Sequence, residues 1–255
     1  MIKIEEAFKN GKAFIPFLTA GDPSLDKTEE FILAMADAGA DLIEIGIPFS
    51  DPIAEGPVIQ EADIRALASG TTVDKIFEMV KSVRAKISIP LVFMTYLNPV
   101  FHYGYEEFCA KCQEAGIAGI IIPDLPYEEK GELDSICQAH SMELISMIAP
   151  TSEDRIRTIA AEAKGFLYVV SSLGVTGVRS EITTDIGAMT AVVKEAGSVP
   201  AAIGFGISGP EQAAKMAQFA DGVIVGSAIV RIIAAKGADA KDDIVAFVKS
   251  IKAAI

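Results

Sequence analysis

Short apolar runs recur along the whole chain and alternate with amphipathic stretches, and this alternation constrains the fold more than any other feature. Most of the runs are nearly continuous valine, isoleucine and leucine, which is typical of strands covered on both faces. The predicted strands are Phe14–Thr19, Leu42–Gly46, Leu91–Thr95, Gly119–Ile122, Glu143–Ile148, Phe166–Val170, Ala201–Gly204 and Gly222–Val225. Helices are predicted between them at Asp26–Ala38, Val73–Lys86, Tyr105–Ala115, Glu128–Ala139, Glu153–Ala163 and Pro210–Phe219.

Alternating strands and helices predict an α/β fold with a parallel sheet, and eight repeats favour closure into a barrel over an open, doubly wound sheet. The chain has 255 residues, close to the roughly 250 typical of a single (β/α)8 TIM barrel. We therefore expect residues 1–255 to form one such domain, with a short extra helix at the N-terminus. In this fold the chemistry lies at the C-terminal ends of the strands.

The composition limits where the chain works and what it binds. No apolar run reaches the roughly 18 residues of a membrane span, and the N-terminus lacks the features of a signal peptide, so we expect a soluble, cytoplasmic protein. A net charge of −13 argues against nucleic acid as a partner, because its phosphates would be repelled. A phosphate on a small ligand can still be held locally by backbone N–H groups.

Cysteine and histidine are scarce, which excludes several chemistries. Cys109 and Cys112 have the spacing of a redox pair but fall within a predicted helix, so two reduced thiols on one helix face are the favoured interpretation. Only 2 histidines are present, and no set of acids and histidines has the spacing of a metal site, so we expect no metal. No lysine stands at the end of a predicted strand, where a Schiff-base aldolase would need one. Carbon chemistry would therefore depend on acid–base groups.

Two acids near the second predicted strand are the candidate catalytic residues. Glu44 lies between two isoleucines of the strand, so it points either into the barrel or toward the helices, where a carboxylate must be paired, protonated or functional. Glu55 follows in a loop whose prolines and glycines restrict its shape. Two carboxylates in different environments could supply one acid and one base. The alternatives are an ion-paired glutamate inside the barrel and a solvated loop acid.

The C-terminal third contains the candidate phosphate site. Gly204, Gly206 and Gly209 match the dinucleotide pattern G-x-G-x-x-G, but they follow the seventh strand, and the next strand ends without an acid for a ribose hydroxyl. In TIM barrels the loops after strands seven and eight frequently bind a phosphate together. We therefore predict that Gly204, Gly206, Gly226 and Ser227 present backbone N–H groups to a phosphate, with Ser227 starting a short helix.

A further glycine-containing segment, residues 171–179, follows the sixth predicted strand. Its two glycines and small polar residues suit a lid that closes over a substrate, although an ordinary long surface loop has the same composition. Both interpretations place this segment at the C-terminal face of the barrel, beside the predicted phosphate site.

Taken together, these segments resemble the α subunit of tryptophan synthase over essentially the whole chain. The most specific stretch runs from Glu44 to Gln60. Further matching segments are residues 16–23, 96–99, 123–126, 174–177 and 204–208. The resemblance implies a lyase that cleaves indole-3-glycerol phosphate to indole and D-glyceraldehyde 3-phosphate. Indole would then pass to a β subunit bearing pyridoxal phosphate, within an α2β2 tetramer, and be joined to L-serine in the last step of L-tryptophan biosynthesis. No cofactor is implied for the α chain itself.

The resemblance also implies residue roles. Glu44 would be the acid–base that protonates indole C3 and helps to deprotonate the glycerol hydroxyl, and Glu55 would stabilise positive charge at the indole N–H. Substrate contacts are implied for Phe17, Ile59, Met94, Tyr96, Ile121, Tyr168, Thr176 and Phe205. Gly177 would join the four predicted phosphate-binding residues, and Thr176 would be the lid residue that contacts the catalytic loop. Loops facing the β subunit would carry Asp51, Asn98 and Pro126.

One position departs from the family pattern and keeps a second function open. The family usually has aspartate where this chain has Glu55, and the extra methylene displaces the carboxylate by about one C–C bond, which matters when reacting geometry must hold within about 1 Å. The alternative is therefore a catalytically weak barrel that mainly binds and activates the β subunit. Another phosphate-binding barrel, such as a sugar-phosphate isomerase, is disfavoured by the apolar pocket and the lack of a catalytic lysine.

Overall fold

The computed structural model describes residues 2–170, 186–204 and 206–255. Within these residues a nine-stranded, wholly parallel sheet runs in the order β5-β4-β3-β2-β1-β9-β8-β7-β6. The strands are β1 Ala13–Thr19, β2 Ile43–Gly46, β3 Leu91–Met94, β4 Gly119–Ile121, β5 Glu143–Ile145, β6 Met147–Ile148, β7 Leu167–Val170, β8 Ala201–Gly204 and β9 Gly222–Val225.

The sheet closes into a barrel because its two edge strands, β5 and β6, follow one another in the chain. Only Ser146 separates them, and its carbonyl accepts a hydrogen bond from the Tyr168 N–H at 3.0 Å, which continues the ladder to β7. The single strand predicted at Glu143–Ile148 is therefore interrupted once, and the other predicted strands agree within about one residue at each end. The predicted TIM barrel is confirmed.

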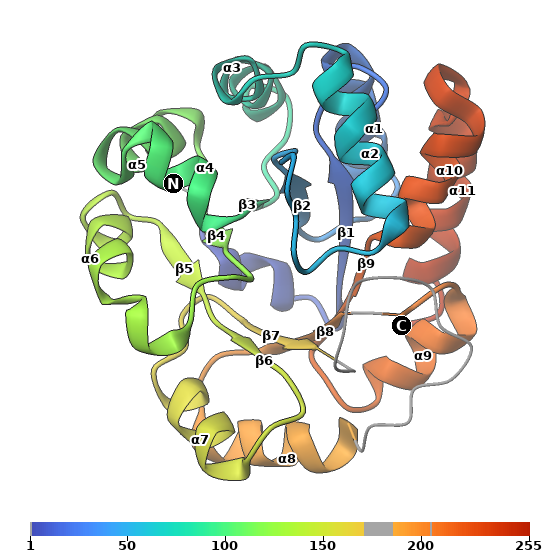
Figure 1. Cartoon of the computed structure of the whole chain (residues 1–255). Helices are drawn as coiled ribbons and strands as arrows, with labels where there is room; N and C mark the ends of the chain where they lie inside the picture. Colours follow the sequence, from blue (N-terminus) through green and yellow to red (C-terminus); the bar gives the residue numbers. More distant parts are fainter. Residues whose placement is uncertain (1, 171–185, 205) are drawn as a thin grey trace.

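Helices surround the barrel (Figure 1). The α-helices are α1 Leu25–Asp37, α2 Pro57–Ala68, α3 Val73–Arg84, α4 Leu97–Tyr103, α5 Tyr105–Ala115, α6 Gly131–Ala139, α7 Glu153–Ala161, α8 Ile186–Ala196, α9 Pro210–Ala217, α10 Ser227–Lys236 and α11 Lys241–Lys252. Three 3-10 helices are η1 Ile4–Phe8, η2 Tyr127–Glu129 and η3 Gly237–Asp239. The expected short N-terminal helix is η1, and the helix predicted at Glu128–Ala139 is divided into η2 and α6.

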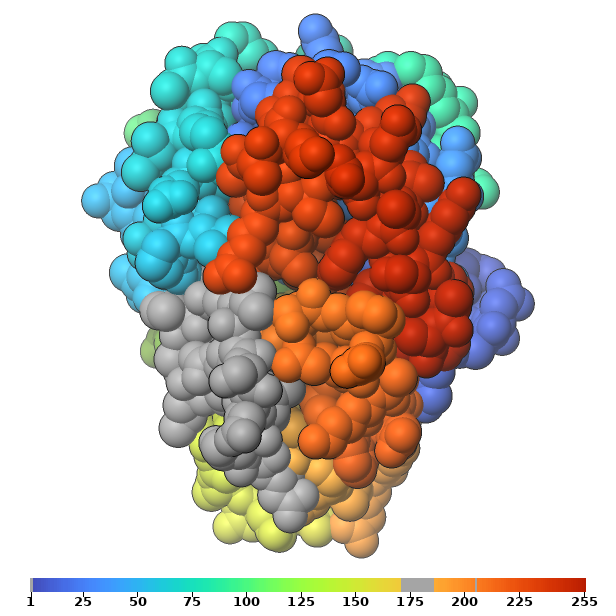
Figure 2. All heavy atoms as spheres, turned by 90° about the vertical axis from the view of Figure 1, so that its right-hand side faces the viewer, coloured from blue at the N-terminus to red at the C-terminus, as the bar shows by residue number. Residues whose placement is uncertain are grey.

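The helices begin where local chemistry favours it. Ser24, Thr72 and Ser152 cap α1, α3 and α7, each accepting a hydrogen bond from a backbone N–H in the first turn. On the face shown in Figure 2, α10, in red, adjoins the cyan segment that contains α2, and α11 packs against both α9 and α10. None of the helices in the described part of the chain is long and apolar enough to cross a membrane.

The core has two layers, and they decide where Glu44 points. Ile43 and Ile45 belong to the layer between sheet and helices, which also contains Phe31, Phe77 and Phe108. The second layer fills the barrel and includes Ile4, Ile15, Phe17, Val92, Ile121, Tyr168 and Ile224. Since strand residues alternate between faces, Glu44 lies on the barrel side, in register with Phe17 and Val92. Ile4 of η1 contributes to the same interior layer from the N-terminal segment.

Candidate active site

Glu44 is held in the middle of β2 inside the barrel, with 1% of its surface exposed. Neither carboxylate oxygen has a hydrogen-bond partner among the described residues, and no cation of that part of the chain pairs with it. Burial raises the pKa of Glu44 from its usual 4.5 to about 8, and the charge of the neighbouring Glu55 adds to the rise. Glu44 is therefore protonated at neutral pH and able to donate a proton. The alternative of an interior ion pair is not what the described residues show.

Glu55 lies in the segment between β2 and α2 and is only 5% exposed. The interpretation as a solvated loop acid is therefore wrong. Around it, the Ala54 N–H donates to the Tyr96 hydroxyl at 2.9 Å, and the Gln60 side chain donates to the Glu55 carbonyl at 2.8 Å. These two bonds tie the segment to the start of α4 and to α2, so the backbone that carries Glu55 is fixed on both sides.

An inner cavity of about 40 Å³ brings both acids together with much of the predicted site. Its walls are formed by Phe17, Glu44, Glu55, Ile59, Met94, Tyr168, Gly206, Ile207, Ile224, Gly226 and Ser227. Residues from six strands or their following segments thus converge at the C-terminal end of the barrel. Ile207 and Ile224 are additions that the sequence did not single out.

An outer cavity of about 350 Å³ adjoins the inner one, since Glu55 and Met94 line both. Apolar residues after β4 and in β5 and β6 form most of its wall, among them Ile122, Leu125 and Ile148. The inner cavity has about the volume of one water molecule, so any ligand larger than that must extend into the outer cavity. The sequence did not reveal the outer cavity, because its residues come from five separate segments.

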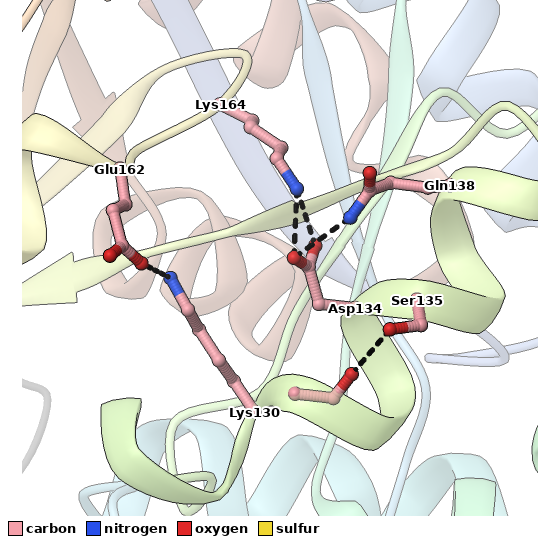
Figure 3. Close-up of polar contacts among 7 residues, drawn as sticks. Lys130, Asp134, Ser135, Gln138, Glu162 and Lys164 are labelled. Carbon is pink, nitrogen blue, oxygen red and sulfur yellow. Dashed lines mark hydrogen bonds and ion pairs between the residues drawn. The ribbon is translucent and has the colours of Figure 1, made fainter.

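Ion pairs hold the wall of the outer cavity between α6 and α7. Lys130, which lines the cavity, pairs with Glu162 at 3.5 Å, and Lys164 pairs with Asp134 at 2.7 Å (Figure 3). Gln138 also donates to Asp134, at 2.9 Å. Arg155 on α7 lines the cavity as well and donates through both terminal nitrogens to Glu128. These contacts link the segments after β4 and β6 along one wall of the cavity.

Three predicted residues lie next to the cavities without forming their walls. Tyr96 is buried and bonded to Ala54 as described, and Ile121 lies inside the barrel, paired in register with Met94. Gly204 ends β8, where a Cβ atom would collide with the Tyr168 hydroxyl. Glycine at this position is therefore required by the position of Tyr168, whatever role its N–H has.

The predicted phosphate-binding residues gather at one helix end. α10 begins at Ser227, as predicted, and Gly226, Ser227 and Gly206 all line the inner cavity. Gly206 has φ +83°, a conformation that favours glycine. The N-terminus of a helix carries unpaired N–H groups and a partial positive charge, so this end is suited to an anion.

The remaining predicted residues fall into two groups. Thr176, Gly177 and Phe205 lie outside the described residues, as does the predicted lid. The predicted partner-contact residues, Asp51, Asn98 and Pro126, are exposed at the same end of the barrel. Asn98 lies within α4, because the segment after β3, expected to be a loop, forms a helix.

Asp63 is a buried acid that the sequence analysis missed. It lies on α2 with 6% exposure, in a buried stripe with Ile59, Ala62 and Ala66. Burial first, and then the charge of Glu55, raises its pKa from 3.8 to about 8. The available signal was an acid at an apolar position of the helical repeat.

Other candidate chemistries find little support. Within residues 2–170, 186–204 and 206–255 no three potential metal ligands are grouped closely enough to hold an ion. Cys109 and Cys112 are buried free thiols in α5, and Cys109 lies 3.8 Å, sulfur to sulfur, from Cys137 on α6. Their burial in the apolar core agrees with two packed thiols rather than a redox pair.

Comparisons with known proteins point to one family. A family model described as "Tryptophan synthase alpha chain" matches residues 4–254. The tryptophan synthase alpha chain of Lactiplantibacillus plantarum is 54% identical over 235 residues, which cover 92% of this chain and 89% of that protein. The corresponding protein of Lacticaseibacillus casei is 48% identical and covers 100% of this chain and 96% of its own length.

Solved structures agree with the sequence comparisons. The crystal structure of the tryptophan synthase alpha chain from Legionella pneumophila has a TM-score of 0.90 and 38% identity, with 100% of this chain and 97% of that chain covered. A structure of the tryptophan synthase α2β2 complex from Pyrococcus furiosus has a TM-score of 0.88 and 38% identity, with 95% and 99% covered. By sequence and by fold, this chain belongs to the tryptophan synthase alpha chain family.

Proposed function

We propose that this chain is the α subunit of tryptophan synthase and cleaves indole-3-glycerol phosphate to indole and D-glyceraldehyde 3-phosphate. The observation that carries the proposal is the burial of Glu44, which raises its pKa to about 8, beside Glu55 in a cavity that ends at the N-terminus of α10. This arrangement supplies a proton donor, an acid to stabilise developing positive charge, and an anion-binding end for the phosphate, each from a different element of the barrel.

The reaction can be written with Glu44 acting twice. Its carboxyl proton goes to indole C3, which places positive charge on the ring nitrogen, where the Glu55 carboxylate stabilises it. The ionised Glu44 then takes the proton of the adjacent glycerol hydroxyl. As that hydroxyl becomes the aldehyde, the bond from its carbon to C3 breaks and the electron pair returns to the ring. Indole is released and Glu44 is again protonated, so no proton is lost or gained.

The side chains of the two cavities would bind the rest of the substrate. Phe17, Ile59, Met94 and Tyr168 offer an apolar surface for the indole ring, and Gly206, Gly226 and Ser227 face the phosphate. Tyr96, Ile121 and Gly204 support these walls, and Thr176, Gly177 and Phe205 are proposed to complete the site. The chemistry uses only side chains of this chain, so we propose that the α reaction needs no cofactor.

The partner would be a β subunit, as in the α2β2 complex of the Pyrococcus furiosus relative. Asp51, Asn98 and Pro126 follow the adjacent strands β2, β3 and β4 and would face that subunit, which would carry pyridoxal phosphate and join indole to L-serine. The complex would work in the cytoplasm. Glu55, in place of the usual aspartate, is the feature that favours the alternative function, a weak catalyst whose main role is to activate the β subunit.

Indole release from indole-3-glycerol phosphate, measured with and without a β subunit, tests the proposal and separates these functions. We expect turnover that the partner increases, and an absence of turnover even with the partner would refute the enzymatic role. Glu44→Gln should abolish cleavage while leaving the binding of indole-propanol phosphate nearly intact, because glutamine keeps the shape without the proton.

Glu143→Gln is the matched control for Glu44. Glu143 is another glutamate whose pKa is raised by burial, to about 7, but it begins β5 at the opposite end of the barrel. Its replacement should leave turnover close to that of the unsubstituted protein. Equal losses in the two variants would mean that any buried glutamate is needed for folding, and Glu44 would not be the proton donor.

A further inference from the structure

Asp63 lies on a buried helix face, where a carboxyl group destabilises the fold unless it is paired, protonated or functional. The buried stripe of α2 consists of Ile59, Ala62, Asp63 and Ala66, the spacing of a helix face that packs on a core. Ile59, one turn before Asp63, lines the inner cavity with Glu44 and Glu55. Asp63 is thus the charged member of an otherwise apolar face, directed toward the segment that carries Glu55.

The groups that act on Asp63 come from the end of β1 and from the segment after β2. The Phe49 N–H and the Glu55 carboxylate face it from the segment after β2, and the Thr19 hydroxyl faces it from the end of β1. The charge of Asp63 also contributes to raising the pKa of Tyr96, at the start of α4. The Tyr96 hydroxyl accepts the hydrogen bond from the Ala54 N–H. Asp63 therefore lies at the junction of β1, α2 and the two bonded segments that position Glu55.

No cation among the described residues offsets the charge of Asp63. Arg65, two residues along α2, donates two hydrogen bonds of 2.8 Å to the Asp22 carboxylate, which is itself buried. The Arg65 guanidinium is therefore bound to Asp22 and does not pair with Asp63. The Asp22 charge is a further cause of the raised pKa of Asp63. Burial and the charge of Glu55 raise the pKa of Asp63 to about 8, so it holds a proton at neutral pH.

We propose that Asp63 is a positioning residue for the Glu55 carboxylate, acting as a neutral carboxyl group that holds the segment 47–56 in its reactive geometry. A protonated carboxyl has one donor and remaining acceptor capacity, so it can serve an ionised neighbour and a backbone N–H at the same time. An ionised Asp63 would instead repel Glu55 and displace it. This inference rests on the proposed function, because it concerns the geometry of the same reaction.

Three variants of α2 test the inference in the complete α2β2 complex. Asp63→Asn keeps a donor and an acceptor without a titrating proton, Asp63→Ala removes both, and Glu61→Gln changes an exposed acid on the same helix. We expect Asp63→Ala to lower kcat by roughly tenfold to a hundredfold, as expected for a displacement of about 1 Å, with a much smaller change in KM. Asp63→Asn should restore most of the loss near pH 7, and Glu61→Gln should match the unsubstituted protein.

The pH profile gives a readout that a merely structural role would not move. In the unsubstituted protein both Glu44 and Asp63 lose protons near pH 8, so the logarithm of kcat/KM should fall above that pH with a slope approaching two. In Asp63→Asn only Glu44 titrates, and the slope should be one. An unchanged slope in Asp63→Asn, or an Asp63→Ala variant with at least half of the normal kcat, would overturn the inference.

Two further measurements separate this inference from folding defects and from the proposed function. The infrared band of protonated carboxylic acids at pH 6 should weaken in Asp63→Asn and not in Glu61→Gln, a result that needs no activity and whose absence would contradict a protonated Asp63. If the unsubstituted complex releases no indole, the proposed function fails. If it releases indole and Asp63→Ala does so equally well, only the role of Asp63 fails.

Discussion

Replacing Glu44 with glutamine should stabilise the protein, by an amount that increases with pH. Folding raises the pKa of Glu44 from 4.5 to about 8, so between these values the folded protein keeps a proton that the unfolded chain has released. Unfolding then releases a proton, and the free energy of unfolding falls by about 1.4 kcal/mol for each pH unit. Over the interval of about 3.5 units the loss is roughly 5 kcal/mol, at the lower end of the total stability of a typical domain.

Glutamine does not titrate, so this loss is absent from Glu44→Gln. The two proteins should have similar unfolding free energies near pH 5. At pH 7 the unfolding free energy of the variant should be higher by roughly 3 kcal/mol. Urea unfolding at pH 5, 6, 7 and 8, followed by far-ultraviolet circular dichroism, measures the difference. A backbone signal suits this chain because it has no tryptophan whose fluorescence could report unfolding.

The opposite result would refute the reasoning. A Glu44 that is ion-paired inside the barrel would have a lowered pKa, and its replacement would then cost stability at every pH above about 5. A difference that is constant with pH, or that favours the unsubstituted protein as the pH rises, would exclude a buried proton on Glu44. Glu61→Gln is the control, since this exposed acid should change the unfolding free energy only slightly.

Three further predictions concern the phosphate end, the barrel wall and the departure from the family pattern. Ser227→Asp puts a negative charge at the N-terminus of α10, where the anion would lie. In a calorimetric titration this variant should bind inorganic phosphate at least roughly tenfold more weakly. Ser135→Asp, which changes an exposed serine, should leave phosphate binding unchanged. Gly204→Ala should destabilise the protein by roughly 1–3 kcal/mol in thermal melts, because the added Cβ collides with Tyr168. Gly131→Ala is the control: its added Cβ meets no atom, so the stability should not change. In the indole-release assay Glu55→Asp should lower kcat less than Glu55→Gln, because only the second change removes the charge; the reverse order would argue against an electrostatic role.

The strands were predictable because their apolar runs are set by burial on both faces of the sheet. The least predictable parts were the short helices at its C-terminal face. α2 begins with Pro57, and α4 contains Pro99; these prolines suggest loops, although a proline in the first turn of a helix leaves no hydrogen bond unmade. The break at Ser146 was also not predictable, because the apolar run continues through it.

The site was predictable where one short stretch of sequence contains it. Glu44 and Glu55 lie eleven positions apart in a segment with a specific pattern, and the structure brings them into one cavity. Asp63 was missed for a physical reason. Its helix also exposes two apolar residues, Ile64 and Leu67, so the sequence alone does not define which face of α2 is buried, and a single acid is then read as solvated.

The departure at Glu55 and the acid at position 63 can be understood together. A glutamate has one more rotatable bond than the aspartate usual in the family, so its carboxylate needs an additional restraint to hold the same position. Asp63 is placed on the buried face of α2 to supply that restraint. It can do so only as a neutral group, because Arg65 is bound to Asp22 and does not neutralise a charge on Asp63. The charge on Glu55 in turn raises the pKa values of both Glu44 and Asp63. Burial and this one ionised acid together keep a proton on Glu44, for transfer to the substrate, and on Asp63, for holding the catalytic segment.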